Sequence, residues 1–396
     1  MDKYINREYA NSKRHTQIET ERSRQAFYIG FTKRHKLPDP CGQGPHWDRI
    51  LAHFIKELSL GINIQNKDDM RYDTILGYVK AAIELFQLRN LPPPFLLDNK
   101  GSIAACILSN IKDEENIAVQ RAHLSVEMYA EILKKSKESD LLSMEQCIAD
   151  FAILGRYLGP QLTEYAQKSY QRAEIHKFPS GKEVVKAICS EDIIFTNEHG
   201  RVVKPDNLLN IHLPTKIKVK FKVQKNRRNG EEKEVLSDVN NEEMCPVKAA
   251  YRIVLRAALL KQPLDLPVGV YQHKNSTRRY LVGSDISKFL RKIAKKAHPD
   301  MTEPDIKRFS AHSFRVTAAV LLHEQGHDGD FIKIQLRWLS DSYRVYLRST
   351  KTILQSHTKA LGESAALSID LANLPKNPSY SVEQIDPNDM GEYHEW

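Results

Sequence analysis

The residues that could do chemistry are concentrated between positions 310 and 346. His312 and Arg315 stand three apart in the run Ser-Ala-His-Ser-Phe-Arg, so both side chains project to one side if a helix starts there. A guanidinium carries a fixed charge and a fork of donors, and an imidazole can donate or move a proton. Such a pair suits the non-bridging oxygens of a phosphodiester, although the spacing also arises by chance or for structural reasons.

A tryptophan and two tyrosines follow after an apolar segment, in the run RWLSDSYRVY that ends at Tyr346. A phenol can attack phosphorus and form a covalent phosphotyrosyl link, which keeps the bond energy for rejoining without ATP. The pentavalent phosphate that develops needs positive charge around it. Tyr343 and Tyr346 compete for the role of nucleophile.

The order and spacing of these residues resemble the C-terminal signature of tyrosine recombinases, a family of DNA strand-exchange enzymes. The resemblance implies that Tyr346 attacks the phosphodiester, while Tyr343 packs in the core. It also implies that His312, Arg315 and Trp338 stabilise the transition state. The products are a 3′-phosphotyrosine and a free 5′ hydroxyl, and the chemistry requires no metal and no nucleotide cofactor.

A basic segment further back, Gln224 to Gly230, resembles the β-hairpin lysine segment of the same family. Lys225 matches the lysine that reaches into the minor groove and protonates the leaving 5′ oxygen. The run Met-Cys-Pro-Val from Met244 follows as in eukaryotic mobile-element members. The alternative is that Lys225 is one of several solvated lysines in a basic strand. Sequence-independent phosphate contacts are expected from Lys216, Lys218, Lys220, Lys222, Arg227 and Arg228.

One position departs from the family pattern. The segment GRYLGPQLTEY resembles the part that bears the family's first catalytic arginine, usually in the form R-x-x-E. Glu164 matches the acidic partner, which is expected to support the site by holding His312, so Gln161 occupies the arginine's position. A glutamine brings no charge, and loss of one preorganised charged donor commonly lowers a rate on the order of 10²- to 10³-fold. Arg156 could substitute, although the intervening Gly-Pro pair favours a different direction for its side chain.

The chain also contains HExxH, from His323 to His327, the zincin motif in which two histidines bind zinc from one helical face. Gly326, with Asp-Gly-Asp directly after His327, predicts that a helix ends there, so His327 is expected to leave that face. No convincing third ligand follows. A zinc peptidase is therefore the remote alternative, and no metal site is expected.

Hydrophobic periodicity predicts a mainly α scaffold with a small antiparallel β-sheet to position these residues. Residues 21–118 carry apolar stripes at helical spacing and predict four or so helices. The two clearest stripes are Ile50, Leu51, Phe54, Ile55 and Leu58, and then Tyr78, Val79, Ala82, Ile83 and Phe86. Two further helices are expected to open at Ser125 and Ser143, and Gln146 would complete a capping box with the second serine.

The period then changes from helical to alternating. Strands are expected at residues 193–196, 201–203, 217–223 and 234–236. In the third of these, apolar residues alternate strictly with lysines, as in a half-buried strand. Asn229-Gly230 supplies the turn to the last strand, which predicts a hairpin.

The sequence is expected to divide into four parts. Residues 1–20 form a flexible polar arm, and residues 21–118 form a helical domain that resembles the family's core-binding, DNA-clamping domain. Residues 119–362 form the α+β catalytic domain of the tyrosine-recombinase type. Residues 363–396 form an acidic, disordered tail.

Bulk composition restricts the partners and the compartment. The chain has 396 residues and a formal net charge of +9, which by itself favours a polyanionic partner only weakly. Its five cysteines include no CxxC pair, so free and mostly buried thiols in a reducing compartment are expected. No apolar run suits a membrane span, and the polar start of the chain resembles no secretory signal. We therefore expect the nucleus if the host is eukaryotic, otherwise the cytoplasm, and no secretion.

These observations predict a site-specific DNA recombinase or integrase of a mobile element. The resemblance implies double-stranded DNA as the partner and a homo-tetramer assembled on DNA. The alternative is a catalytically impaired, DNA-binding descendant that kept the fold, because Gln161 brings no charge to the first arginine's position.

Overall fold

The computed structural model describes residues 15–42, 44, 46–62, 70–94, 101–115, 120–178, 180–224, 228–274 and 277–347. Contacts within the chain separate residues 1–346 from residues 347–396, so every described element except the last residue of the final helix belongs to the first unit. Among the described residues, no helix is both long and apolar enough to cross a membrane. The predicted acidic tail lies outside the described residues.

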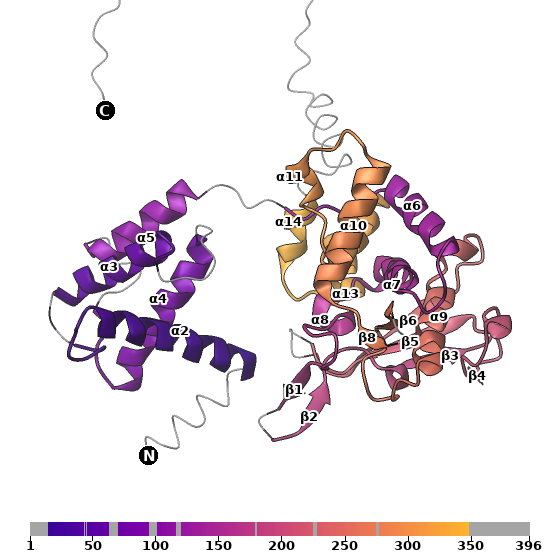
Figure 1. The fold of residues 1–396 in the computed structure, drawn as a ribbon, viewed down its shortest axis with the longest axis horizontal. Helices are drawn as coiled ribbons and strands as arrows, with labels where there is room; N and C mark the ends of the chain where they lie inside the picture. Colours follow the sequence, from indigo (N-terminus) through magenta and orange to yellow (C-terminus); the bar gives the residue numbers. More distant parts are fainter. Residues whose placement is uncertain are drawn as a thin grey trace, which may run out of the picture. The chain divides into compact units, whose positions relative to one another are not determined.

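The described N-terminal part consists of helices around one apolar core (Figure 1). These helices are α2 (His15–Arg34), α3 (His46–Ser59), α4 (Tyr72–Leu88) and α5 (Ile103–Glu114). Both predicted stripes face this core, because Leu51 and Phe54 of α3 and Val79 and Phe86 of α4 are buried in it. Asp48 of α3 accepts hydrogen bonds from the Ser102 hydroxyl (2.6 Å) and from the first N–H of α5 (2.8 Å), which ties the start of α5 to α3.

Helix α2 begins at His15, within the residues 1–20 that were predicted as a flexible arm, and the rest of that predicted arm lies outside the described residues. Periodicity did not reveal this start, since the first turns of α2 are polar. They contain residues with good helix propensity, and Gln17 donates a hydrogen bond to Glu21 one turn later (3.2 Å). The predicted boundary at residue 118 lies outside the described residues.

The rest of the described chain is mainly helical with small antiparallel sheets, which confirms the predicted fold class. Its helices are α6 (Val126–Lys137), α7 (Met144–Leu158), α8 (Leu162–Tyr165), α9 (Pro246–Leu259), α10 (Gly283–Ala297), α11 (Glu303–Ile306), α12 (Ser313–Glu324), α13 (Gly329–Leu336) and α14 (Arg344–Leu347). Short 3-10 helices are η1 (Ser190–Asp192), η2 (Leu208–Asn210), η3 (Glu242–Met244) and η5 (Asp341–Tyr343). Its strands are β1 (Ile175–Lys177), β2 (Glu183–Val185), β3 (Ile193–Thr196), β4 (Val202–Val203), β5 (Lys216–Phe221), β6 (Glu231–Leu236), β7 (Val270–Gln272) and β8 (Arg278–Tyr280).

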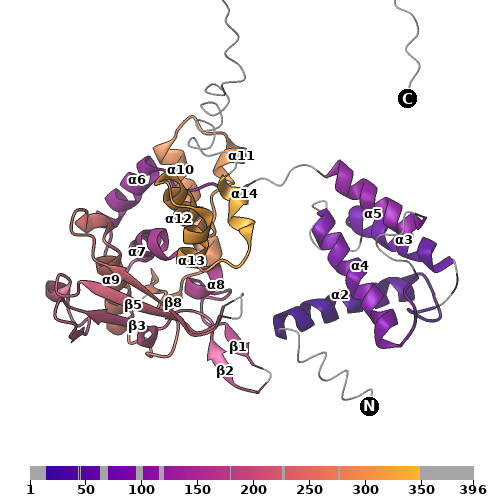
Figure 2. The same cartoon turned by 180° about the vertical axis from the view of Figure 1, so that it is seen from behind.

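The main sheet has the order β4-β3-β5-β6 and is antiparallel throughout. Strand β5 confirms the predicted half-buried strand, because Ile217, Val219 and Phe221 are buried while the lysines between them face the other side. Two separate hairpins, β1–β2 and β7–β8, complete the strands, and β1–β2 projects away from the sheet (Figure 2).

Helix α7 runs through the middle of this second core and packs against α6, α9 and α12 (Figure 1). The predicted serine caps are confirmed, because Ser125 accepts from the Met128 N–H and Ser143 from the Gln146 N–H. The reciprocal half of the predicted capping box is wrong. The Gln146 amide oxygen instead accepts from the Ser136 hydroxyl (2.6 Å), and the Ser143 N–H donates to the Asp140 carbonyl (3.0 Å).

Candidate active site

The start of α12 presents His312 and Arg315 together, as their spacing predicts. His312 caps the helix, and its carbonyl accepts the N–H groups of Arg315 and Val316 (3.1 and 3.2 Å). Phe314 lies between them and packs into the core, which fixes the rotation of the helix. The Tyr165 hydroxyl donates to the Ala311 carbonyl (2.5 Å) and holds the approach to this turn.

Tyr346 completes a cluster with these two residues and Trp338. Its hydroxyl lies 2.8 Å from Nε2 of His312, a hydrogen bond whose direction depends on the histidine tautomer. The rings of Trp338 and Tyr346 lie 5.7 Å apart, and the Arg315 guanidinium carbon lies 4.6 Å from the centre of the Trp338 ring. The structure therefore brings together four predicted site residues that are up to 34 positions apart.

Tyr343, the competing candidate, packs in the core instead. It is 3% exposed, and its ring lies 5.5 Å from that of Trp338. A Cβ atom at position 329 would collide with its hydroxyl, so a glycine is required at the start of α13 to admit the tyrosine. Of the two tyrosines, Tyr346 is the one whose hydroxyl contacts His312.

Burial sets the protonation of the cluster. It lowers the pKa of His312 to about 4, with help from the positive charges of Arg315 and Arg121, so the imidazole is neutral near pH 7. Burial lowers the pKa of Arg315 to about 10, which still leaves the guanidinium charged. Burial raises the pKa of Tyr346, although the charge of Arg315 opposes this. The phenol thus keeps its proton at rest and has a neutral imidazole that can accept it.

Glu164 does not hold His312, and that expectation is wrong. Its two carboxylate oxygens accept hydrogen bonds from the Arg337 guanidinium (3.0 and 2.9 Å), and one also accepts from the Gln161 N–H (2.7 Å). A bidentate arginine pair satisfies a buried carboxylate better than a single neutral imidazole can. Arg337 was not singled out from the sequence. This residue directly follows α13 and has a positive φ (60°), a conformation in which glycine is more common at the end of a helix.

In the segment that resembles the family's first-arginine region, Gln161 and Arg156 lie as the sequence predicted. Gln161 precedes α8 and contributes its backbone N–H to Glu164, but it brings no charge. The Arg156 guanidinium lies over the Tyr129 ring, 5.7 Å from its centre, so its side chain is occupied elsewhere in the structure. Arg315 itself donates to the carbonyl of Gly159, the residue in a left-handed conformation that ends α7.

The predicted general acid, Lys225, and Arg227 lie outside the described residues. The hairpin on either side of them is ordered by Gln224. Its N–H donates to the Asn229 side chain (2.8 Å), its side-chain amide donates to the Arg228 carbonyl (2.6 Å), and its amide oxygen accepts from Arg337 (3.2 Å). The structure therefore anchors the ends of the loop that carries Lys225.

The predicted phosphate-contacting lysines of β5 differ in their surroundings. Lys218 pairs with Glu232 (3.2 Å) and Glu234 across the hairpin, and half-buried Lys222 pairs with Asp192 (2.8 Å). Lys220 is exposed. The carboxylates of the neighbouring strand and of η1 thus offset part of the charge that the lysine pattern suggested.

Within the described residues, the zincin motif lacks its required geometry. Helix α12 ends at Glu324, Gly326 has a φ of 83°, and the His327 ring stacks on Phe331 at 4.1 Å. As predicted from the sequence, the second histidine leaves the helix, which argues against a zinc peptidase.

One group of metal-capable side chains occurs elsewhere in the described part of the chain. His35, His53 and Glu57 place one ligand atom each within 4.8 Å of one another. The Glu57 carboxylate is already bonded to Arg34 (3.2 Å) and His35 (2.5 Å). Its charge is thereby matched by protein groups, so this cluster has a sufficient explanation without an ion.

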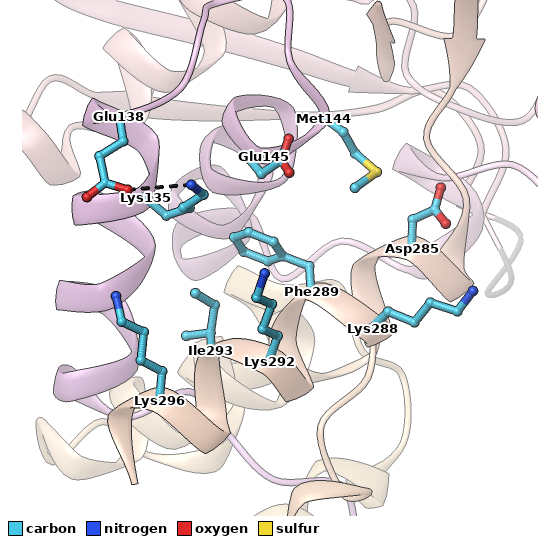
Figure 3. A pocket seen from close by; sticks show the side chains of 10 residues that line it. All are labelled: Lys135, Glu138, Met144, Glu145, Asp285, Lys288, Phe289, Lys292, Ile293 and Lys296. Carbon is cyan, nitrogen blue, oxygen red and sulfur yellow. Dashed lines mark hydrogen bonds and ion pairs between the residues drawn. The ribbon is translucent and has the colours of Figure 1, made fainter. Parts of the chain in front are cut away.

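A cavity of about 410 Å³ lies between α6, the start of α7 and α10 (Figure 3). Its floor is apolar, with Phe289, Ile293 and Met144, and four lysines stand around it. None of the predicted site residues lines this cavity, so the candidate active site is the cluster around His312 and not this hollow.

No protein-family model and no curated protein matches the sequence. Among solved structures, the chain is similar to a crystal structure of XerA recombinase, at 15% identity and a TM-score of 0.36, over 91% of this chain and 98% of that one. It is similar to XerH site-specific recombinase bound to difH substrate in a post-cleavage complex, at 14% identity and a TM-score of 0.47, over 80% and 72% of the two chains. It is also similar to Tn1549 transposon integrase in complex with transposon right end DNA, at 11% identity and a TM-score of 0.45, over 91% and 98%. At these values the likeness assigns no activity to this chain.

Proposed function

We propose that this protein is a site-specific DNA recombinase or integrase that breaks and rejoins DNA through Tyr346. The observation that carries the proposal is the Tyr346 hydroxyl, 2.8 Å from a neutral His312, in a cluster with Trp338 and Arg315. A nucleophilic hydroxyl, a proton acceptor and a fixed positive charge are the parts that attack on a phosphodiester requires.

The proposed reaction follows from these parts. His312 accepts the phenolic proton as the Tyr346 oxygen bonds to phosphorus, and the bond between phosphorus and the 5′ oxygen breaks. Lys225 donates a proton to that leaving oxygen, as the resemblance implies for its position. Arg315 and Trp338 donate to the non-bridging oxygens, which stabilises the pentavalent transition state. The resulting 3′-phosphotyrosyl bond is attacked by a 5′ hydroxyl when the strands rejoin.

The same proposal includes the expected partners and compartment. Double-stranded DNA is bound by the helical N-terminal domain and the catalytic domain, and a homo-tetramer assembles on two DNA sites. Phosphate contacts come from Lys220, Arg227 and Arg228. Lys218 and Lys222 add to them when they exchange their carboxylate partners, Glu232 and Asp192, for phosphates. A mobile-element recombinase of this type acts in the nucleus of a eukaryotic host, or otherwise in the cytoplasm.

A second candidate is a DNA-binding descendant with impaired catalysis. It is favoured by one observation: Gln161 supplies no charge at the predicted first-arginine position, and Arg156 is directed to Tyr129. Such a protein would bind DNA with strong salt dependence but form no covalent link.

The two candidates are separated by covalent capture on a pool of nicked duplexes of randomised sequence, which trap a cleaved strand. We expect an adduct that survives denaturation and is lost in Tyr346→Phe. Tyr343→Phe is the matched control, because it removes a phenolic hydroxyl that lies in the core, and it should retain the adduct. DNA binding with no adduct from any member of the pool would instead establish the second candidate.

A further inference from the structure

The three segments that carry the proposed chemistry meet at one buried guanidinium, that of Arg337. Its side chain is 0% exposed, and it leaves the backbone at the left-handed residue that ends α13, directly before Trp338. A charged side chain with no exposure is costly unless every contact is made with good geometry. The hydrogen-bond partners of the Arg337 guanidinium therefore indicate the role of this buried charge.

These partners come from both sides of the site. Glu164, beside the Gln161 position, accepts two hydrogen bonds from Arg337 (3.0 and 2.9 Å). Gln224, directly before Lys225 in the chain, accepts a third (3.2 Å), and the Phe221 ring lies 3.3 Å from the guanidinium carbon. Arg337 thus joins α8 and the β5–β6 hairpin to the turn that leads to Trp338 and Tyr346.

The carboxylate of Glu164 also acts on Arg315. Arg315 donates to the Gly159 carbonyl, two residues before Gln161, and the Glu164 carboxylate accepts the Gln161 N–H, so both charged groups contact the same short segment. In agreement with this, Glu164 raises the pKa of Arg315, while Arg337 lowers it. A buried carboxylate without Arg337 would take the other guanidinium as its partner. In the observed arrangement Arg337 occupies both oxygens of Glu164, and Arg315 contacts only the Gly159 carbonyl and the Trp338 ring face among the interactions of the described residues.

We propose that Arg337 is a positioning residue that engages Glu164, and so keeps Arg315 available to a DNA phosphate, and that anchors the Lys225 hairpin through Gln224. The proposal deepens the proposed function and rests on it. Because Arg337 is fully buried, it acts through these neighbours and does not touch the substrate. The contact between Arg337 and Glu164 also explains how the site keeps the charge of Arg315 free of a carboxylate partner among the described residues, although Gln161 brings no charge.

The test measures binding of inorganic phosphate to the full chain, with the His312 imidazole signals in NMR as the readout, and so needs no catalysis. Arg337→Met should weaken phosphate binding on the order of 10-fold, because Glu164 then captures Arg315. Arg337→Met combined with Glu164→Gln should recover most of that affinity, because no carboxylate remains. A purely architectural role predicts the opposite, since the double variant would be at least as impaired as the single one.

Arg256→Met is the matched control, because Arg256 is also fully buried against a carboxylate but contacts no site residue; it should leave phosphate binding unchanged. If Arg337→Met does not fold, Arg337→Lys replaces it. Lysine keeps a charge at Glu164 but cannot also reach Gln224, so we expect near-normal phosphate affinity and faster amide hydrogen exchange in residues 221–231.

Unchanged phosphate affinity in the folded Arg337→Met protein, or no recovery in the double variant, would overturn the proposal, and so would a wild-type protein that shows no phosphate response at His312. Failure of the proposed function is recognised separately, by a wild-type chain that binds phosphate at His312 but forms no adduct with DNA.

Discussion

Two buried arginine–carboxylate pairs in the second core have the same chemistry and different surroundings. Arg256 pairs with Asp150, and both side chains are 0% exposed. Arg337 pairs with Glu164, and their side chains are 0% and 3% exposed. A buried ion pair by itself is weak evidence for either stability or function, so the elements that each pair joins decide its role.

The pair of Arg256 and Asp150 joins the last turn of α9 to the middle of α7. Asp150 accepts further bonds from Arg252 (2.6 Å) and Gln146 (3.0 Å), and Arg256 donates to the Leu141 carbonyl (2.6 Å). The pair of Arg337 and Glu164 instead joins the ends of short elements, where the predicted site residues lie. Helices α7 and α9 also pack against each other through buried apolar residues, whereas the pair of Arg337 and Glu164 ties together segments that carry predicted site residues. We therefore assign the first pair to the core and the second to the site.

The largest expected effect tests the core pair. Arg256→Met leaves Asp150 with Arg252 and Gln146 but removes its buried partner, so the free energy of unfolding should fall by about 3–5 kcal/mol. Denaturant unfolding measures this loss. Phosphate binding by the molecules that remain folded should match the wild type, and a weakened site in this variant would remove the distinction between the two pairs.

A smaller effect concerns pH, because the site contains a half-buried neutral histidine, His312. The pKa of His312 is about 4 in the folded protein, against an ordinary value of 6.5. Between these two pH values the unfolded chain binds more protons, so stability rises with pH through this window and the contribution is complete above pH 6.5. The difference corresponds to about 3 kcal/mol.

His312→Asn should therefore flatten the dependence of unfolding free energy on pH between these values, relative to the wild type. Denaturant titrations at a series of pH values provide the measurement. Ile217→Val serves as the reference, since it lowers stability by shortening a buried apolar side chain, changes no titratable group and should keep the wild-type slope. Equal slopes for His312→Asn and the wild type would show that the imidazole is not buried in its neutral form.

The smallest effect tests the charge missing beside Glu164. Gln161→Arg adds a guanidinium at the predicted first-arginine position, and because Arg337 already occupies both oxygens of Glu164, the new group remains free for a phosphate. We expect the rate of adduct formation to rise about 10²-fold. Single-turnover kinetics on the nicked duplex pool measure it. An unchanged rate would contradict the alignment that assigns Gln161 to that position.

The sequence predicted those parts of the site that rest on local spacing. The three-residue interval of His312 and Arg315 placed both on one helical turn, and strict alternation located β5. These features depend on the period of a single element, which neighbouring residues determine. The burial of Tyr343 was expected instead from the family resemblance, and the structure buries this residue.

The role of Arg337 could not be predicted in the same way. Its partner Glu164 lies 173 positions away, and nothing in the local sequence of either residue points to the other. The same reason explains the wrong expectation that Glu164 holds His312, since a carboxylate takes whichever donor the fold brings closest. The start of α2 could not be predicted either, because its first turns are polar and hydrophobic periodicity detects a helix only through its apolar face.

The most direct test of the account identifies the atom that carries the DNA. Covalent adducts from the nicked duplex pool would be digested with protease and nuclease, and the modified peptide sequenced by mass spectrometry. We predict a nucleotide remnant on Tyr346 and an unmodified Tyr343, both in one peptide when the protease does not cleave after Arg344. A remnant on Tyr343 or on any other residue would contradict the assignment of Tyr346 as the nucleophile.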